Sequence, residues 1–376
     1  MKILYVLNGT LHLAGTESVI LNYYNNIDRS KIKIDFVLNA SKSELEKNDI
    51  CSYLISMGSK VFCITPKRDS IKQNKRELLE ILNDGNYDAV HSHADAVGAY
   101  FLRLAKKAGV KIRIAHSHNT KHQLIKKGIK NRIHFAYLEI ERKGIRRVAT
   151  HFMACSKEAG EWLFGEKIIN NNNKFFILNN AIDIDRFKFD ANVRKAVRKD
   201  LSIADNTLVI GHVGRFEFQK NHIFLLKIYA SIQKRCPDSK LLLVGEGSLK
   251  DDIVNQSKEL GIFDNIIFYG TKIDVSDVYN AMDAFIFPSL FEGLGIVLIE
   301  AQCNGLKCFM TDNEYVPKDP IITKNVKTIP IDNPDEWANE ILNSELARED
   351  GTDSVRNHGY DIKVEAKKLE RYYLSL

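Results

Sequence analysis

The 376-residue chain has little of what marks disulfide-stabilised, metal-stabilised or membrane-spanning proteins. Its six cysteines are scattered and form no CxxC pair. This usage is typical of reduced cytosolic thiols and argues against a disulfide framework or a cysteine zinc site. No apolar run approaches the ~20 residues that a membrane-spanning helix needs. The run 2–7, apolar after Lys2, gives way to polar Asn8 too early for a signal peptide, so we predict a first strand there and a cytoplasmic protein.

The net excess of positive over negative residues is accounted for by one segment of the chain. The 54 Lys and Arg residues nearly balance the 48 Asp and Glu residues, for a formal net charge of +6. Residues 121–147 hold nine basic residues against two acidic ones, a net +7. We expect this segment to dock on the anionic inner face of the plasma membrane, the alternative being an ordinary hydrated face. No nucleic-acid partner is expected. The apolar residues of the segment are spaced for one helical face: Ile125, Ile129, Ile133, Tyr137 and Ile140.

Short aliphatic runs alternate with amphipathic stretches, a pattern typical of parallel α/β construction. The length predicts two domains. The alternation lapses at 179–200 and resumes at Leu208, so we assign a first lobe to 1–190, a second to 191–360 and a terminal helix to 361–376. Two such lobes offer a cleft at the carboxyl ends of their strands. Strands are predicted at 2–7, 32–38, 60–64, 87–92, 111–116, 151–155, 174–178, 208–213, 240–244, 265–269, 283–287, 307–310 and 326–330.

The most informative stretch runs from Phe287 to Ala301. A predicted buried strand ends there in a glycine-flanked loop, and a helix follows from about Gly295. Glycines allow the backbone to approach a ligand, and the first N–H groups of a helix point at anions. Glu292 in the loop and Glu300 on the helix would repel phosphate, so they are better suited to accept hydrogen bonds from sugar and ribose hydroxyls. The alternative is a capped strand–helix turn with solvent-facing acids.

Two further predicted strands end in loops with charge or glycine. Arg215 follows strand 208–213 and Lys220 starts the next helix, so the two cations can converge on a diphosphate. The alternative is that both are solvated. Loop cations bury little area, so we expect their removal to leave the fold intact. The strand 240–244 leads into Gly-Glu-Gly, but Lys250 stands where a dinucleotide fingerprint has its third glycine, which disfavours a nicotinamide cofactor.

Two His-x-His pairs, His91/His93 and His116/His118, end predicted strands of the first lobe. Alternate strand residues share a face, so the pairs raise the question of a metal. No acidic or cysteine ligand accompanies them at regular spacing, and hydrogen bonding to a polar ligand is the preferred interpretation. Asp183-Ile184-Asp185 is a literal DxD motif, but it lies between the lobes, where we interpret it as hinge capping.

In this order, these features resemble the retaining glycosyltransferases of family 4, particularly those of bacterial capsule, O-antigen and exopolysaccharide assembly. The resemblance runs nearly end to end and implies the GT-B fold. In this fold two Rossmann-like lobes face across a cleft, and a C-terminal helix crosses back to the first lobe. The motifs that carry it are Gly15 with Glu17, residues 115–119, residues 180–183, Gly214-Arg215 with Lys220, Gly245-Glu246-Gly247, and Glu292 and Glu300 with seven residues between them.

The resemblance implies a role for each residue of the donor site. Arg215 and Lys220 bind and neutralise the donor diphosphate, which is the leaving group. Glu300 bonds the ribose hydroxyls. The donor-binding residues that the resemblance adds around the sugar and the phosphates are Glu292, Gly293, Leu294, Gly295 and Glu246.

It further implies that His118 lies beside the sugar near the reacting carbon, and that Gly15 lets its loop approach the phosphates. No metal and no cofactor are expected, because the cations and a helix N-terminus stabilise the charge. The implied donor is a UDP-sugar carrying a hexosyl or N-acetylhexosaminyl group. The implied acceptor is a glycan linked to polyprenyl diphosphate.

Two other classes remain open. Sugar-nucleotide epimerases share the two-lobe fold and the diphosphate site without transferring a sugar, and a non-catalytic sugar-nucleotide-binding protein would need the site alone. The spacing of Glu292 and Glu300, together with Arg215 and Lys220, favours the transferase.

Overall fold

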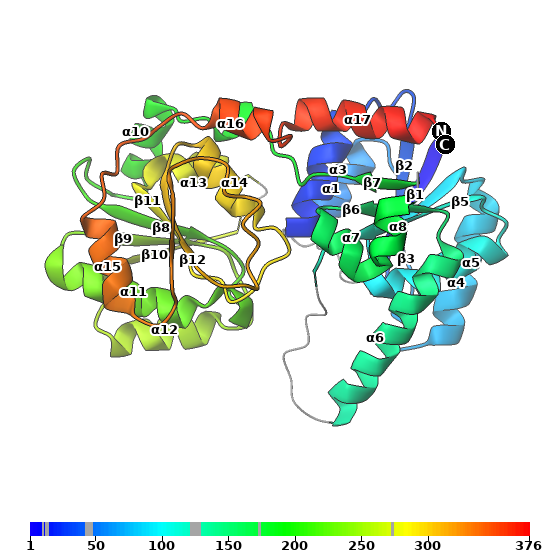
Figure 1. Ribbon diagram of the computed structural model, residues 1–376, viewed down its shortest axis with the longest axis horizontal. Helices are drawn as coiled ribbons and strands as arrows, with labels where there is room; N and C mark the ends of the chain where they lie inside the picture. The colour runs from blue at the N-terminus through cyan, green and yellow to red at the C-terminus, as the bar shows by residue number, and fades with distance from the viewer. Residues whose placement is uncertain (10, 12–14, 42–47, 121–128, 172–173, 272–273) are drawn as a thin grey trace. The chain divides into compact units, whose positions relative to one another are not determined.

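The computed structural model describes residues 1–9, 11, 15–41, 48–120, 129–171, 174–271 and 274–376. Its contacts divide the chain into two compact units, each built on one parallel sheet (Figure 1). The first unit contains the first strand, Thr16–Asn180 and Lys363–Leu376, and the second contains Ala181–Ile362. No helix among the described residues is both long and apolar enough to span a bilayer.

The first unit has a seven-stranded sheet in the order β3-β2-β1-β4-β5-β6-β7. Every pair of neighbours is parallel. Its strands read as near-continuous apolar runs because helices cover a parallel sheet on both faces. The strands are β1 (Lys2–Leu7), β2 (Lys33–Leu38), β3 (Val61–Cys63), β4 (Ala89–Ser92), β5 (Ile112–Ser117), β6 (His151–Ala154) and β7 (Phe175–Ile177).

The helices of the first unit follow its strands in alternation. The core between sheet and helices contains Leu102 and Phe101 of α5, together with Leu163 of α7. The helices are α1 (Gly15–Asn26), α3 (Asp49–Ser56), α4 (Ile71–Gly85), α5 (Gly98–Lys107), α6 (Ile129–Val148), α7 (Lys157–Phe164), α8 (Glu166–Asn171) and, from the end of the chain, α17 (Ile362–Leu374).

The second unit repeats the plan with six parallel strands in the order β10-β9-β8-β11-β12-β13. The strands are β8 (Val209–Val213), β9 (Lys240–Val244), β10 (Ile266–Gly270), β11 (Ala284–Phe287), β12 (Lys307–Thr311) and β13 (Val326–Ile329). The helices are α9 (Ile184–Phe187), α10 (Ala191–Asp200), α11 (His222–Arg235), α12 (Lys250–Glu259), α13 (Ser276–Ala281), α14 (Ile296–Cys303), α15 (Pro334–Leu342) and α16 (Thr352–Asn357).

The C-terminal helix α17 belongs to the first unit by a buried hydrogen-bonded contact. The Tyr373 hydroxyl lies 2.6 Å from that of Tyr5 on β1 and 2.6 Å from Nδ1 of His91 on β4. The last helix of the chain therefore packs on the sheet built by its beginning. The two Rossmann-like lobes and the returning helix expected from the sequence are confirmed.

Candidate active site

Three loops meet at the carboxyl edge of the second unit's sheet, because β9, β8 and β11 are neighbours. Backbone hydrogen bonds tie them together. Gly214 N donates to Val244 O at 2.9 Å, Phe216 N to Glu246 O at 2.9 Å, and Leu290 N to Gln219 O at 2.8 Å. The loops that carry Arg215, Glu246 and Glu292 are therefore one connected platform.

Lys220 and Glu292, 72 residues apart in sequence, form an ion pair in this platform. Lys220 Nζ lies 2.6 Å from Glu292 Oε1, and the two side chains are only 14% and 6% exposed. Gln219 Nε2 donates to Glu292 Oε2 at 3.1 Å and to Phe291 O at 2.9 Å. The expectation that loop cations bury little area is wrong for Lys220, because the closed loop packs its stem against Gly214.

Glu300 is buried on α14, where Tyr279 of α13 donates a hydrogen bond to its Oε2 at 2.5 Å. Burial raises the pKa of Glu300 to about 7, and the Tyr279 bond opposes that rise. A carboxyl group with this pKa changes charge near neutral pH. The sequence gives no cue for Tyr279, because the two side chains meet only through the packing of α13 beside α14.

The remaining donor-site candidates lie on the same loops. Arg215 is exposed. Glu246 is half-exposed and pairs with Lys250 at 2.6 Å. Gly295 has a φ of 87° and precedes the first residue of α14, and a Cβ there would lie 2.9 Å from the Phe287 ring. Leu294 is buried and Gly293 is partly exposed. The predicted glycine loop thus turns in a left-handed conformation directly into a helix N-terminus.

The four histidines of the two His-x-His pairs form a buried array at the ends of β4 and β5. The rings of His91 and His93 stack at 4.1 Å and those of His116 and His118 at 4.0 Å. His91 Nε2 lies 3.1 Å from His116 Nδ1, and His93 Nδ1 lies 3.0 Å from His118 Nε2. Burial lowers the pKa of all four, to about 3 for His118, so the array is neutral at neutral pH.

Asp95 holds the segment that carries His118. Its carboxylate accepts hydrogen bonds from His118 N and from Asn119 Nδ2, both at 2.7 Å. Asp95 itself adopts a φ of 42°, an uncommon value for a non-glycine residue. Burial raises the pKa of Asp95 to about 6. The Nδ1 atom of His118 is buried and has no protein partner among the described residues.

The structure bears on two questions that the sequence raises, whether the histidine pairs form a metal site and whether Asp183 is a helix cap. Ring nitrogens of His91, His93 and His116 lie within 4.8 Å of one another, a spacing that a metal ion can use. Both nitrogens of His91 are already hydrogen-bonded, however, to Tyr373 and to His116. Asp183 is the N-cap of α9 and accepts a hydrogen bond from Asp185 N, so its interpretation as a cap is confirmed.

Gly15 is the exposed first residue of α1, with no atom within 4 Å of where its Cβ would be.

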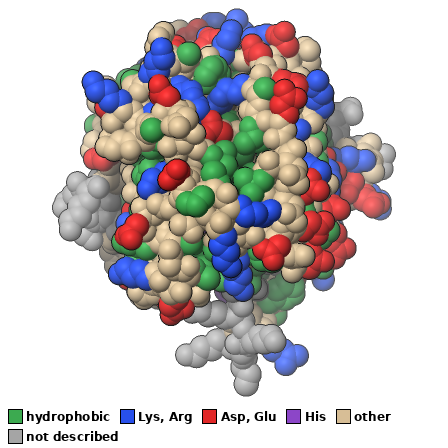
Figure 2. Space-filling view, turned by 90° about the vertical axis from the view of Figure 1, so that its left-hand side faces the viewer, with side chains coloured by type: hydrophobic (Ala, Val, Ile, Leu, Met, Phe, Trp, Pro, Cys, Tyr) green, Lys and Arg blue, Asp and Glu red, His purple; other side chains and the backbone are tan. Residues whose placement is uncertain are grey.

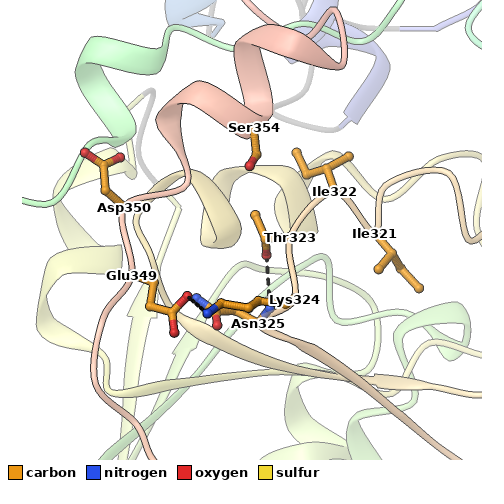
Figure 3. Close-up of a pocket in the computed structure, with 8 residues that line it drawn as sticks. All are labelled: Ile321, Ile322, Thr323, Lys324, Asn325, Glu349, Asp350 and Ser354. Atoms are coloured by element: carbon orange, nitrogen blue, oxygen red, sulfur yellow. Dashed lines mark hydrogen bonds and ion pairs between the residues drawn. The ribbon is translucent and has the colours of Figure 1, made fainter.

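A cavity of about 410 Å³ in the second unit is lined by Lys324 and Glu349, which pair at 3.2 Å (Figure 3). It borders Asn325, just before β13 begins, and so lies at the opposite edge of the sheet from the donor-site loops.

Comparisons with known proteins identify the family of the chain. Residues 13–186 match the family "Glycosyltransferase Family 4", and residues 193–354 match "Glycosyl transferases group 1". The putative glycosyltransferase EpsF of Bacillus subtilis is 31% identical over 99% of this chain and 96% of its own. An Escherichia coli UDP-Gal:alpha-D-GlcNAc-diphosphoundecaprenol alpha-1,3-galactosyltransferase is 24% identical over 80% of this chain and 76% of its own.

Among solved structures, Anabaena HepE in complex with UDP and glucose aligns with a TM-score of 0.79 at 17% identity, over the whole of both chains. The fold is therefore GT-B. The chain belongs to the group 1, family 4 glycosyltransferases, a family of retaining hexosyltransferases.

Proposed function

We propose that the protein transfers a hexosyl or N-acetylhexosaminyl group from a UDP-sugar to a lipid-linked glycan in bacterial surface-polysaccharide synthesis. The observation that carries the proposal is the Lys220–Glu292 pair at the carboxyl edge of the second sheet, on the loop after β8 that also carries Arg215. HepE was solved with UDP and glucose, and the E. coli relative is named for a UDP-sugar donor and a diphosphoundecaprenol-linked acceptor.

The chemistry follows from where charge develops. A hydroxyl oxygen of the acceptor forms the new bond to the sugar carbon as the bond from that carbon to the diphosphate oxygen breaks, and the hydroxyl proton passes to the departing diphosphate. The departing oxygen becomes more negative while its bond breaks. Arg215, Lys220 and the N-terminus of α14 stabilise that charge, which is why the reaction needs no metal. Glu292 accepts hydrogen bonds from the donor sugar, and Glu300 accepts them from the ribose. A role for His118 near the reacting carbon stays the prediction that the family resemblance implies.

A donor panel tests the proposal. UDP-, GDP- and ADP-sugars are compared by thermal shift, and we expect the UDP-sugars alone to stabilise the protein, by about 2.7 kcal/mol at 100 times Kd. NMR of the transfer product should show the donor's anomeric configuration, with or without EDTA. Stabilisation by GDP-mannose alone would contradict the choice of donor, an epimerised donor would indicate the epimerase, and sensitivity to EDTA would return the histidine array to consideration as a metal site.

Glu300 predicts a pH dependence of donor binding. A carboxyl with a pKa of about 7 is ionised at pH 8 and mostly protonated at pH 6, and only the carboxylate accepts a bond from each ribose hydroxyl. We expect the Kd of a UDP-sugar to rise about tenfold from pH 8 to pH 6. The histidines of the array do not titrate in this range. Calorimetry on Glu300→Gln should show weaker binding without the change centred near pH 7, leaving only the change at the acid end that Asp95, with a pKa of about 6, can cause. An unchanged pH profile would exclude the Glu300 carboxyl as its source.

The same shift has a defined effect on stability. The native state holds the Glu300 proton more tightly than the unfolded chain, whose carboxyl has the ordinary pKa of 4.5. Its contribution to the free energy of unfolding is therefore complete below pH 4.5 and is lost as the pH rises through 7.

Membrane docking through residues 121–147 is part of the proposal. Lys121, Lys126 and Lys127 lie outside the described residues. In the described part of α6, Arg132 is exposed, and Ile133 and Ile140, seven residues apart and so on one face of the helix, are 67% and 68% exposed. The prediction that Tyr137 shares this exposed face is wrong, because its hydroxyl accepts a hydrogen bond from Lys67 and its side chain is partly buried. The face seen in Figure 2 instead shows Lys and Arg interspersed with Asp and Glu. A basic surface with exposed isoleucines suits an anionic bilayer.

Liposome co-sedimentation tests docking. Binding should need anionic lipid and weaken at high salt, because the attraction is screened. It should fall when Lys126, Lys127, Lys130 and Arg132 become Gln. Replacing four lysines elsewhere, such as Lys195, Lys199, Lys227 and Lys234, is the matched control for net charge. Equal binding to neutral vesicles, or none at low salt, would make the segment an ordinary hydrated surface.

A further inference from the structure

The first unit contains a cavity that the donor site does not use. It has a volume of about 590 Å³ and lies where β1, β2 and β3 end. Its lining includes Asn8 and Asn39, the cations Lys67 and Arg68, and Tyr137 of α6. All of its lining residues belong to the first unit. Ile71, 59% exposed, gives the cavity an apolar wall beside the two cations.

Lys67 is the unusual residue of this cavity. Its Nζ donates to the Tyr137 hydroxyl at 2.8 Å and lies 4.0 Å from the centre of the Tyr100 ring. The ammonium group is about half buried, and no carboxylate among the described residues is ion-paired with it. Glu141, whose charge also acts on Lys67, binds Arg103 through both oxygens at 2.6 Å. Burying an ammonium group costs free energy unless an anion pairs with it. Binding of an anionic ligand would supply that partner.

Hydrogen bonds fix the position of Lys67. Asn39 Oδ1 accepts from Lys67 N at 3.3 Å and from Asn74 Nδ2 at 2.8 Å, and Asn39 Nδ2 donates to Asn8 Oδ1 at 2.8 Å. The loops after β1, β2 and β3 are thereby joined. Tyr137 accepts from Lys67 and keeps its own O–H, which can be donated to a ligand in the cavity.

We propose that this cavity binds the diphosphate of a lipid-linked acceptor, with Lys67 as its fixed cation, the Tyr137 hydroxyl as a donor, and Arg68 at the rim. Two cations and a hydroxyl suit a diphosphate better than a neutral glycan. Ile71 supplies the apolar surface that the first isoprene units would cover. The inference rests on the proposed function for the existence of such an acceptor, but not on the donor site.

Farnesyl diphosphate is the probe for this cavity. Calorimetry on the full chain should show binding that Lys67→Met weakens by about tenfold or more and Lys67→Arg largely preserves. Methionine keeps an apolar stem over Tyr100, so the variant should fold. Tyr137→Phe should weaken binding to a smaller extent. Lys111→Met, an exposed lysine before β5, is the matched control and should bind as the wild type does.

Two further ligands and a competition experiment test the lipid and the diphosphate parts of the proposal separately. Farnesol and inorganic pyrophosphate should each bind more weakly than farnesyl diphosphate, and equal binding of pyrophosphate would overturn the lipid part of the proposal. Full affinity in Lys67→Met, or displacement of the probe by UDP, would overturn the site. The UDP-sugar thermal shift is measured on the same variants. If the UDP-sugar still stabilises the protein but farnesyl diphosphate does not bind, the proposed donor function stands and the cavity proposal is wrong. If farnesyl diphosphate binds but no UDP-sugar stabilises the protein, only the donor assignment is wrong.

Discussion

Replacing Lys220 by Met should lower turnover by about two to three orders of magnitude, and Arg215→Ala should do the same. This is the range for loss of one preorganised group that stabilises transition-state charge. Both side chains lie on the connected loops after β8, at the edge of the sheet where the donor diphosphate is proposed to bind. The measurement is the rate at saturating donor and acceptor. Lys227→Met, an exposed lysine on α11, is the matched control and should keep the wild-type rate.

The two variants should differ in stability. Arg215 is exposed, so its removal should leave the melting temperature unchanged. Lys220 is paired with Glu292, and removing one partner of a buried pair costs about 3–5 kcal/mol. The double variant Lys220→Met/Glu292→Gln removes the unpaired carboxylate and should recover stability without recovering turnover. If the double variant also regained the rate, Lys220 would be a structural partner of Glu292 and not a leaving-group cation.

Much of the fold was accessible from the sequence. All thirteen predicted strands exist, with ends within two residues of those predicted, because parallel strands buried on both faces read as short aliphatic runs. The loops that carry Arg215, Glu246 and Glu292 were also predictable, since ligand sites of such sheets lie where strands end. Helix α17 was visible as an amphipathic stretch.

Which side chains pair with one another could not be predicted from the sequence. The Lys220–Glu292 bond joins residues that are 72 positions apart, and Tyr279 meets Glu300 only because α13 and α14 pack together. The histidine pairs were noticed as a motif, but their stacking and their link to Tyr373 depend on the neighbouring register of β4 and β5 and on α17. Lys67 has no motif at all. Its proposed role depends on the aromatic rings that surround it in the folded protein.

Gly245→Ala should disable the donor site without touching any charged group. Gly245 follows β9 with a φ of 146°, and a Cβ there would lie 2.0 Å from the carbonyl oxygen of Gly214, the residue before Arg215. Backbone cannot yield as a flexible side chain does. Strain and overlap together should cost about 2–6 kcal/mol. A displacement of ~1 Å in the Arg215 loop should lower turnover about a hundredfold.

Gly261→Ala is the control that separates strain from displacement. Gly261 also has a positive φ, of 69°, but nothing lies within 4 Å of its Cβ position, and it is in the turn after α12. Alanine there should cost only the left-handed penalty of about 1–2 kcal/mol and leave turnover unchanged. Melting temperature, UDP-sugar affinity and turnover are measured on both variants, at a temperature where both are folded. Because the Gly245 methyl group pushes on the loop that positions Arg215, its loss of turnover should exceed what its loss of stability explains. Equal turnover in the two variants would mean that the contact between the β8 and β9 loops supports the fold but does not position the leaving-group cation.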